Sequence, residues 1–172
     1  GLAFDATAGL SLGEFTALAA ADALGFEDGL RVVRRRGEVM QHACETSAGG
    51  MAAIVGLDEE TVRDVCGQAG VSLANLNCPG QIVISGDADK METACAAAKA
   101  AGAKRAISLP VAGAYHSPLM QSAQGGLAEA LDKVELREPL VPVYSNVTGQ
   151  AHAAAGTIAD TMVDQVTSPV RW

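Results

Sequence analysis

Aromatic residues, basic blocks and long apolar runs are all scarce in this sequence of 172 residues. Phe, Trp and Tyr supply 3% of it and hydrophobic residues 49%, so we expect a core of small aliphatic side chains. The formal net charge is −8 with no basic block to offset it, which argues against a nucleic-acid partner. No apolar run approaches the ~20 residues that span a bilayer, and no signal peptide is visible, so we expect no membrane partner.

The cysteines and histidines are dispersed along the chain. The four cysteines form no C-x-x-C pair, and the three histidines show no metal-ligand spacing. We therefore expect no metal site and a reduced, soluble protein of the cytoplasm. The length suits one domain or two small ones with a real core.

Apolar runs and the breaks between them predict two structural units. The first unit opens with a strand over 4–8 and helices over 11–23 and 27–44, and it stops at the Gly-rich break 47–50. The next stretch predicts strands and helices in the order βαββαβ, a ferredoxin-like arrangement. These elements are expected over 51–57, 59–69, 71–77, 81–85, 87–101 and 104–111.

The first unit resumes after this insertion. It continues with a helix from Ser117 to 133, a strand over 141–144 and a helix over 157–166. We therefore expect an α/β fold in which a larger unit, residues 1–48 and 113–172, is interrupted by a small subdomain, residues 50–112.

A Gly-x-Ser-x-Gly pentad, Gly9 to Gly13, lies between the first predicted strand and helix. This spacing suits a sharp turn in which both glycines avoid collisions and Ser11 stands clear of the two elements. The backbone N–H of Leu12 then points out of a helix N-terminus, where it can hold an oxyanion. An ordinary Gly-rich turn explains the pentad alone equally well.

A serine nucleophile needs a base, and His116 is the best placed of the three histidines. It directly precedes a helix N-terminus, which disfavours the protonated ring, although a solvated histidine explains the position alone more simply. His42 is expected on a helix surface and His152 in a loop. Because Asp87 and Asp89 lie in the inserted unit, no carboxylate is placed as a third triad member, and a carbonyl or an amide is expected to orient the base.

Three consecutive arginines, Arg34 to Arg36, lie in the second predicted helix. Successive helical residues point about 100° apart, so at least two of the three are expected on a solvated face. Arg36 precedes Gly37, and a glycine inside a helix predicts that something packs closely against its backbone. A guanidinium at a cleft binds a carboxylate bidentately, so a site with Ser11, His116 and Arg36 favours acylation by a substrate with a free carboxylate.

Amide side chains gather around the turn Cys78-Pro79-Gly80. Asn75, Asn77 and Gln81 flank this turn and can hydrogen-bond an amide-rich ligand arm. Turn chemistry explains them about as well, so both interpretations stay open.

Five motifs follow one another along the chain. They are Gly9-Leu10-Ser11-Leu12-Gly13-Glu14, Arg36-Gly37 with Met40-Gln41, Asn75 to Gly86, Gly113 to Met120, and Val141 to Gly149. Together they closely resemble the malonyl-CoA:acyl carrier protein transacylases of fatty acid synthesis, over essentially the whole chain. Similar acyltransferase domains occur in polyketide synthases.

The resemblance implies an α/β-hydrolase-like large subdomain, incomplete here, with a ferredoxin-like small one. It implies a ping-pong reaction in which malonyl-CoA acylates a serine, CoA leaves, and the phosphopantetheine thiol of acyl carrier protein attacks the malonyl-serine ester. No cofactor is implied, because malonyl-CoA and the carrier protein are substrates. The implied site consists of Ser11 as nucleophile, His116 as base, Leu12 as an oxyanion donor, Arg36 as partner of the malonyl carboxylate, and Leu10, Asn75, Asn77 and Gln81 as the pantetheine and acyl pocket.

The chain departs from the family pattern in two respects. Leu10 stands where the family usually has histidine, which we expect to be tolerated because no chemical step requires that histidine. An N-terminal Gly-Gln-Gly motif, whose glutamine N–H completes the oxyanion hole, is absent, as are a C-terminal Gly-Pro-Gly segment and a glutamine that helps place the histidine. We therefore expect the middle of a longer protein, truncated at both ends; one lost oxyanion donor costs on the order of 10²–10³ in kcat.

Other functions share part of this pattern. A polyketide synthase acyltransferase domain shares the motifs, a serine thioesterase or esterase shares Ser11 and His116 without needing Arg36, and a non-catalytic fragment would only dock a carrier protein. An acidic carrier protein needs a basic surface despite the net charge, for which the candidates are Arg34, Arg35, Lys104 and Arg105. We expect a monomer.

Overall fold

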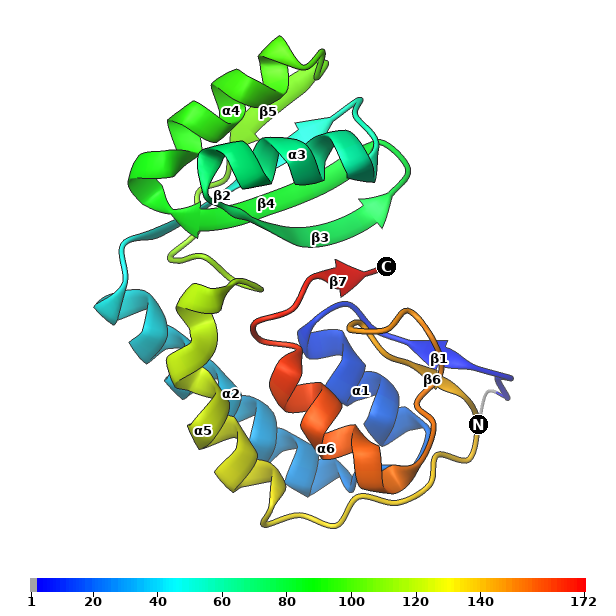
Figure 1. The fold of residues 1–172 in the computed structure, drawn as a ribbon. Helices are drawn as coiled ribbons and strands as arrows, with labels where there is room; N and C mark the ends of the chain where they lie inside the picture. The colour runs from blue at the N-terminus through cyan, green and yellow to red at the C-terminus, as the bar shows by residue number, and fades with distance from the viewer. Residues whose placement is uncertain (1–2) are drawn as a thin grey trace.

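The computed structural model describes residues 3–172 and places their strands in two sheets (Figure 1). The strands are β1 (Thr7–Ala8), β2 (Gly49–Val55), β3 (Ser72–Cys78), β4 (Gln81–Asp87), β5 (Arg105–Ser108), β6 (Val143–Tyr144) and β7 (Val170–Arg171). One sheet has the mixed order β5-β2-β4-β3-β7, and β1 pairs in parallel with β6 in the other. The protein is therefore an α/β protein with both parallel and antiparallel pairing.

Two helices, α3 (Glu59–Ala69) and α4 (Met91–Ala100), cover one face of the larger sheet (Figure 1). The chain runs through β2, α3, β3, β4, α4 and β5 in the order that the sequence predicts. The side chain of Asp58 caps α3 by accepting from the N–H of Thr61, and Gly70 ends the helix in a left-handed conformation. Small aliphatic side chains such as Ile54 and Ile84 fill the space between helices and sheet.

Four helices and the β1–β6 pair form a second part of the molecule, apart from the larger sheet and its two helices (Figure 1). The helices are α1 (Leu12–Ala20), α2 (Phe26–Thr46), α5 (Gln121–Leu131) and α6 (Ala155–Asp164). In α2, Val32, Arg36 and Met40 are buried at a spacing of four residues, which places them on one helix face. Within residues 3–172, no helix has the length and apolar character needed to cross a membrane.

Some element boundaries differ from those that the apolar pattern predicts. The strand expected over 4–8 is reduced to β1, because only Thr7 and Ala8 pair with β6. The helices expected from 87 and from Ser117 each begin with a 3-10 turn, Ala88–Lys90 and Pro118–Met120 respectively. The Ser117 hydroxyl caps the turn Pro118–Met120 by accepting from the backbone N–H of Leu119.

The strand β7 is not predicted by the sequence. Two residues that follow a proline are too few to show a periodicity. β7 pairs in parallel with β3, with Val170 opposite Asn75, so the last part of the chain is attached to the edge of the larger sheet. This contact brings the end of α6 close to that sheet.

The turn between β1 and α1 has the sharp geometry that the Gly-x-Ser-x-Gly spacing predicts. Ser11 has φ 54° and ψ −106°, a conformation that side-chain-bearing residues rarely adopt. A Cβ on Gly9 would lie 1.9 Å from the carbonyl oxygen of Gly13, so glycine is required there. A Cβ on Gly13 would have open space, and the expectation that both glycines avoid a collision is wrong for Gly13.

The two glycines therefore provide a matched pair of substitutions. We predict that Gly9→Ala lowers the free energy of unfolding by about 1–3 kcal/mol or more, because the added methyl group overlaps the first turn of α1. Gly13→Ala, which adds the same methyl group in open space inside a helix, is expected to raise it by about 0.5–1 kcal/mol. Urea denaturation followed by circular dichroism measures both, and equal stability of the two variants would contradict the close approach at Gly9.

Candidate active site

A cavity of about 420 Å³ lies where the start of α1, the middle of α2 and the larger sheet meet. Its lining comes from segments far apart in the sequence: Leu10, Ser11, Arg36, Gly37, Met40, Gln41, Met51, Asn75, Tyr115 and His116. A larger cavity of about 590 Å³ near Trp172 has neither serine nor histidine among its described lining residues. The smaller cavity is therefore the candidate active site.

Ser11 and His116 are in hydrogen-bond contact in this cavity. Ser11 Oγ lies 2.9 Å from His116 Nε2, and His116 Nδ1 lies 2.9 Å from the main-chain oxygen of Gln165. Because a carbonyl oxygen can only accept, Nδ1 carries the proton and Nε2 is left to accept from the serine hydroxyl. The imidazole is thus oriented by a backbone carbonyl in place of a carboxylate.

The environment of His116 favours the neutral ring. Its side chain is buried, and burial lowers the pKa of His116 below its ordinary value near 6.5. The hydrogen bond to Gln165 opposes this shift, and the positive charge of Arg36 adds to it. A neutral imidazole whose Nε2 faces a hydroxyl has the form that a general base requires.

Arg36 lies beside the same serine and is only 6% exposed. Its Nη2 donates to Ser11 Oγ at 2.8 Å and to Gln165 Oε1 at 3.1 Å, and its guanidinium lies over the ring of Phe15. Burial lowers the pKa of Arg36, while the nearby carboxylate of Glu14 opposes that shift. Among the described residues, Arg36 Nε is the one buried side-chain nitrogen or oxygen without a hydrogen-bond partner.

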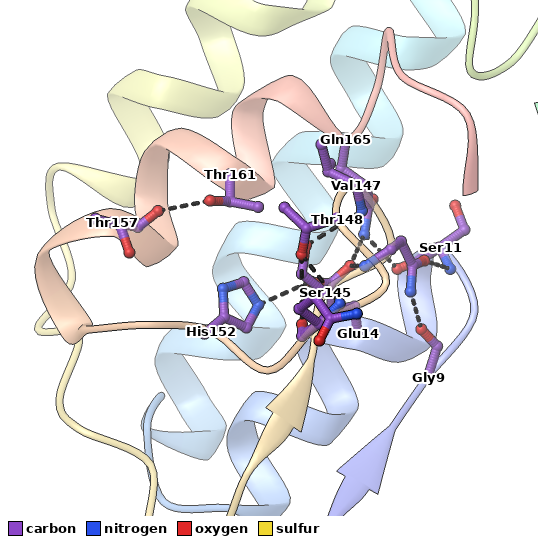
Figure 2. A network of polar contacts seen from close by, with 12 residues as sticks. Gly9, Ser11, Glu14, Ser145, Val147, Thr148, His152, Thr157, Thr161 and Gln165 are labelled. Carbon is purple, nitrogen blue, oxygen red and sulfur yellow. Dashed lines mark hydrogen bonds and ion pairs between the residues drawn. The ribbon is translucent and has the colours of Figure 1, made fainter. Parts of the chain in front are cut away.

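Two amide side chains hold the backbone of Ser11 (Figure 2). Asn146 Oδ1 accepts from the Ser11 N–H at 2.5 Å, and Asn146 Nδ2 donates to the carbonyl of Gly9 at 2.8 Å. Gln165 Nε2 donates to the Ser11 carbonyl at 3.1 Å. These contacts stabilise the unusual positive-φ conformation of Ser11.

The backbone N–H of Leu12 is the first in α1. The next two N–H groups, those of Gly13 and Glu14, donate to the carbonyls of Leu10 and Ser11. The first N–H of a helix has no acceptor in a preceding turn, so that of Leu12 is available to an oxygen atom bound near Ser11.

The structure brings most of the predicted site residues together. Leu10 and Asn75 line the cavity with the serine, the histidine and the arginine. Asn77 and Gln81 do not line it: Gln81 is exposed, and its Oε1 accepts from Cys78 Sγ at 3.7 Å. The remaining basic candidates, Arg34, Arg35, Lys104 and Arg105, are all exposed.

Two expectations about single residues are wrong. A Cβ on Gly37 would meet nothing within 4 Å, so no segment packs against that backbone, and Gly37 lines the cavity instead. A glutamine that places the histidine is present, because Gln165 provides the carbonyl that orients His116. Gln165 was missed because a glutamine after a helix has no local pattern that distinguishes it from a solvated one.

The sequence also does not identify Glu14, Asn146 and His152 as part of this site. Glu14 and Asn146 lie inside two of the resembling motifs, and this is the one signal that marks them. His152, expected in a loop, has its Nε2 2.9 Å from Glu14 Oε1, with both side chains almost fully buried. Nowhere within residues 3–172 do three His, Cys, Asp or Glu side chains gather as metal ligands do.

Comparison with known proteins shows one consistent relationship. The family model described as "Acyl transferase domain" matches residues 1–172. The malonyl CoA-acyl carrier protein transacylase of Bacillus subtilis is 47% identical over 177 residues, which cover 100% of this chain and 56% of that protein. The chain thus spans a little over half the length of the curated relatives it matches.

Solved structures agree with the sequence comparison. The acyl-carrier-protein S-malonyltransferase of Burkholderia pseudomallei matches with a TM-score of 0.95 at 44% identity, over 100% of this chain and 57% of that one. A type II polyketide synthase acyl-carrier protein in complex with its malonyl-transacylase matches with a TM-score of 0.95 at 40% identity, with the same coverage. The described residues therefore have the α/β fold of these enzymes over part of their length.

The lowered pKa of His116 gives a direct test of the site's electrostatics. We predict that NMR titration of the imidazole signals shows a midpoint for His116 below 6.5, because burial disfavours the charged ring. The signal is assigned by its loss in His116→Asn. A midpoint above 6.5 would show that the ring is solvated or paired with a negative charge.

Proposed function

The chain belongs to the acyl transferase domain family, and from that premise we propose that it transfers a malonyl group from malonyl-CoA to the phosphopantetheine thiol of acyl carrier protein. The observation that carries this proposal is the convergence of Ser11, His116 and Arg36 in one cavity. A serine–histidine pair supports acyl transfer, and a buried guanidinium beside it selects an acyl group with a free carboxylate.

In the first half-reaction, Ser11 Oγ attacks the thioester carbon of malonyl-CoA while its proton passes to His116 Nε2. The tetrahedral oxyanion accepts from the Leu12 N–H. The carbon–sulfur bond then breaks, and the departing CoA sulfur takes the proton from His116. The products are free CoA and a malonyl ester on Ser11.

In the second half-reaction, the phosphopantetheine thiol gives its proton to His116 Nε2, and its sulfur attacks the ester carbon. The bond to Ser11 Oγ breaks, and Oγ recovers the proton from His116. Each half-reaction begins and ends with the neutral imidazole, which is the form that the lowered pKa of His116 favours. No cofactor takes part, since both thiols belong to substrates.

We assign the malonyl carboxylate to the Arg36 guanidinium. The unpartnered Nε supports this assignment, because a buried N–H without an acceptor is costly and a bound carboxylate would satisfy it. The adjacent Nη2 already donates to Ser11 Oγ, so a carboxylate bound there would hold the thioester carbon close to the nucleophile.

The pantetheine arm, in this proposal, leaves the cavity past Leu10 and Asn75 and follows β3 toward Asn77 and Gln81. Asn75 is buried on the cavity wall, Asn77 lies farther along β3, and Gln81 begins β4 after the turn. The carrier protein would be acidic and would contact the exposed basic residues Arg34, Arg35, Lys104 and Arg105. A carrier protein of fatty acid or of polyketide synthesis fits, since the related transacylase noted above was solved with a polyketide carrier.

We propose an incomplete α/β-hydrolase-like unit of residues 1–48 and 113–172 with an inserted ferredoxin-like unit of residues 50–112. The strand order β5-β2-β4-β3, with both helices on one face, supports the second part. We further propose a monomer in the cytoplasm, which the four free cysteines suit.

The proposed ester on Ser11 can be weighed directly. We predict that intact-mass spectrometry after mixing with malonyl-CoA shows a single malonyl adduct on the wild-type chain and none on Ser11→Ala. If the wild type stays unmodified, the same measurement on the complete polypeptide that carries these residues decides the matter. An unmodified complete polypeptide would overturn the transacylase proposal.

Substituting Arg36 distinguishes a malonyl transferase from a serine esterase. We predict that Arg36→Ala slows acylation by malonyl-CoA by about 10- to 150-fold relative to acylation by acetyl-CoA, since a charge-assisted hydrogen bond contributes about 1.5–3 kcal/mol. Arg35→Ala, on the exposed neighbour, serves as the control and is expected to leave this ratio unchanged. An unchanged ratio in Arg36→Ala would favour the esterase alternative.

A further inference from the structure

Glu14 is a buried acid that the proposed chemistry does not use. It lies in the first turn of α1, three residues after Ser11, and it is 0% exposed. A carboxylate in such a place is costly unless donors surround it. Three donors do so: the Asn146 N–H at 3.0 Å, Gln165 Nε2 at 2.6 Å and His152 Nε2 at 2.9 Å. Figure 2 labels Glu14 with the last two of these partners.

One of these partners, Gln165, contacts the proposed nucleophile, the proposed base and the proposed carboxylate-binding arginine. Its Nε2 donates to the Ser11 carbonyl as well as to Glu14, and its Oε1 accepts from Arg36. Its main-chain oxygen accepts from His116 Nδ1. A shift of this one residue would therefore displace the nucleophile, the carboxylate-binding guanidinium and the base together.

The second partner, Asn146, holds the other side of the serine. Its main-chain N–H is fixed by Glu14, while its side chain accepts from the Ser11 N–H and donates to the Gly9 carbonyl. The third partner, His152, contacts the second carboxylate oxygen and is itself buried. Glu14 thus joins the start of α1, the turn after β6 and the end of α6.

We propose that Glu14 is a positioning residue: its carboxylate holds Gln165 and Asn146 in place, and through them keeps Ser11, His116 and Arg36 in their mutual geometry. This inference rests on the proposed function for the roles of those three residues, but not for the identity of the acyl substrate. Side-chain length matters more than charge, because one side chain must reach three partners that belong to separate segments.

The test measures the reactivity of Ser11 without either natural substrate. An alkyl fluorophosphonate reacts with a serine that is activated by its histidine, and intact-mass spectrometry of the complete polypeptide gives the rate per folded molecule. We expect Glu14→Ala to lower that rate by about 10- to 100-fold, since a misplacement near 1 Å can cost about 100-fold. Glu14→Asp keeps the charge but shortens the reach; it is expected to lower the rate by about 10-fold, and it carries the test if Glu14→Ala does not fold.

The conservative substitution separates geometry from charge. In Glu14→Gln the side-chain oxygen still accepts from Gln165 and Asn146, while the new NH₂ faces His152, whose Nε2 accepts in the other tautomer. We expect this variant to react within about fivefold of the wild type, because the cost is about that of one ordinary hydrogen bond. A loss in Glu14→Gln as large as that in Glu14→Asp would contradict the positioning role.

Two controls separate positioning from general stability. Leu127→Ala removes a buried apolar side chain of α5 that takes no part in these hydrogen bonds, so it is expected to lower the melting temperature and leave the labelling rate unchanged. In a double-mutant cycle, Glu14→Ala combined with Gln165→Ala is expected to react no more than about threefold slower than the slower single variant, since both act on one geometry. Independent, multiplying effects would overturn the proposal, as would wild-type labelling of a folded Glu14→Ala.

The outcomes also separate this inference from the proposed function. A wild-type protein that reacts with the probe but takes no malonyl group would refute malonyl transfer and leave the role of Glu14 to be decided by its variants. A wild-type Ser11 that does not react with the probe would overturn the inference, because there would be no activated nucleophile to position.

Discussion

Ser11 presents its hydroxyl to the cavity from a backbone conformation with positive φ that a serine does not favour. The rest of the site depends on this constraint. Glycine at position 9 makes room for the turn, and the side chains of Asn146 and Gln165 hold the serine N–H and carbonyl. The carboxylate of Glu14 accepts from the Gln165 side chain and from the main-chain N–H of Asn146. The strain is local, but the contacts that offset it come from the far end of the chain.

The surroundings of each ionisable group in the site favour the protonation state that its proposed role requires. The proposed base is held neutral by burial and is oriented by a carbonyl, which fixes its tautomer without adding a negative charge. The arginine stays charged beside it because its pKa, although lowered by burial, starts far above neutrality. The buried acid lies behind the serine, where it is surrounded by donors and does not face the cavity.

Local chemistry explains which parts could be predicted from the sequence. The sharp turn at Ser11, the capped helix after Asp58 and the strand–helix order from β2 to β5 each have their own signals and are present in the structure. Gln165 and the β7 strand could not be predicted, because their roles come from contacts with residues 49 and about 95 positions away. At Gly37 the local signal was misleading. A glycine inside a helix predicted a closely packed neighbour, but the space beside Gly37 is part of the cavity.

The order of these segments along the chain has a consequence for synthesis. The nucleophile lies near the start of the described residues, the base follows 105 positions later, and the carbonyl that orients the base comes 49 positions after that. On a ribosome the serine therefore emerges long before the groups that activate it. Until Gln165 has been made, the carbonyl that orients His116 is missing, so Ser11 and His116 of a growing chain lack the complete hydrogen-bond geometry described above.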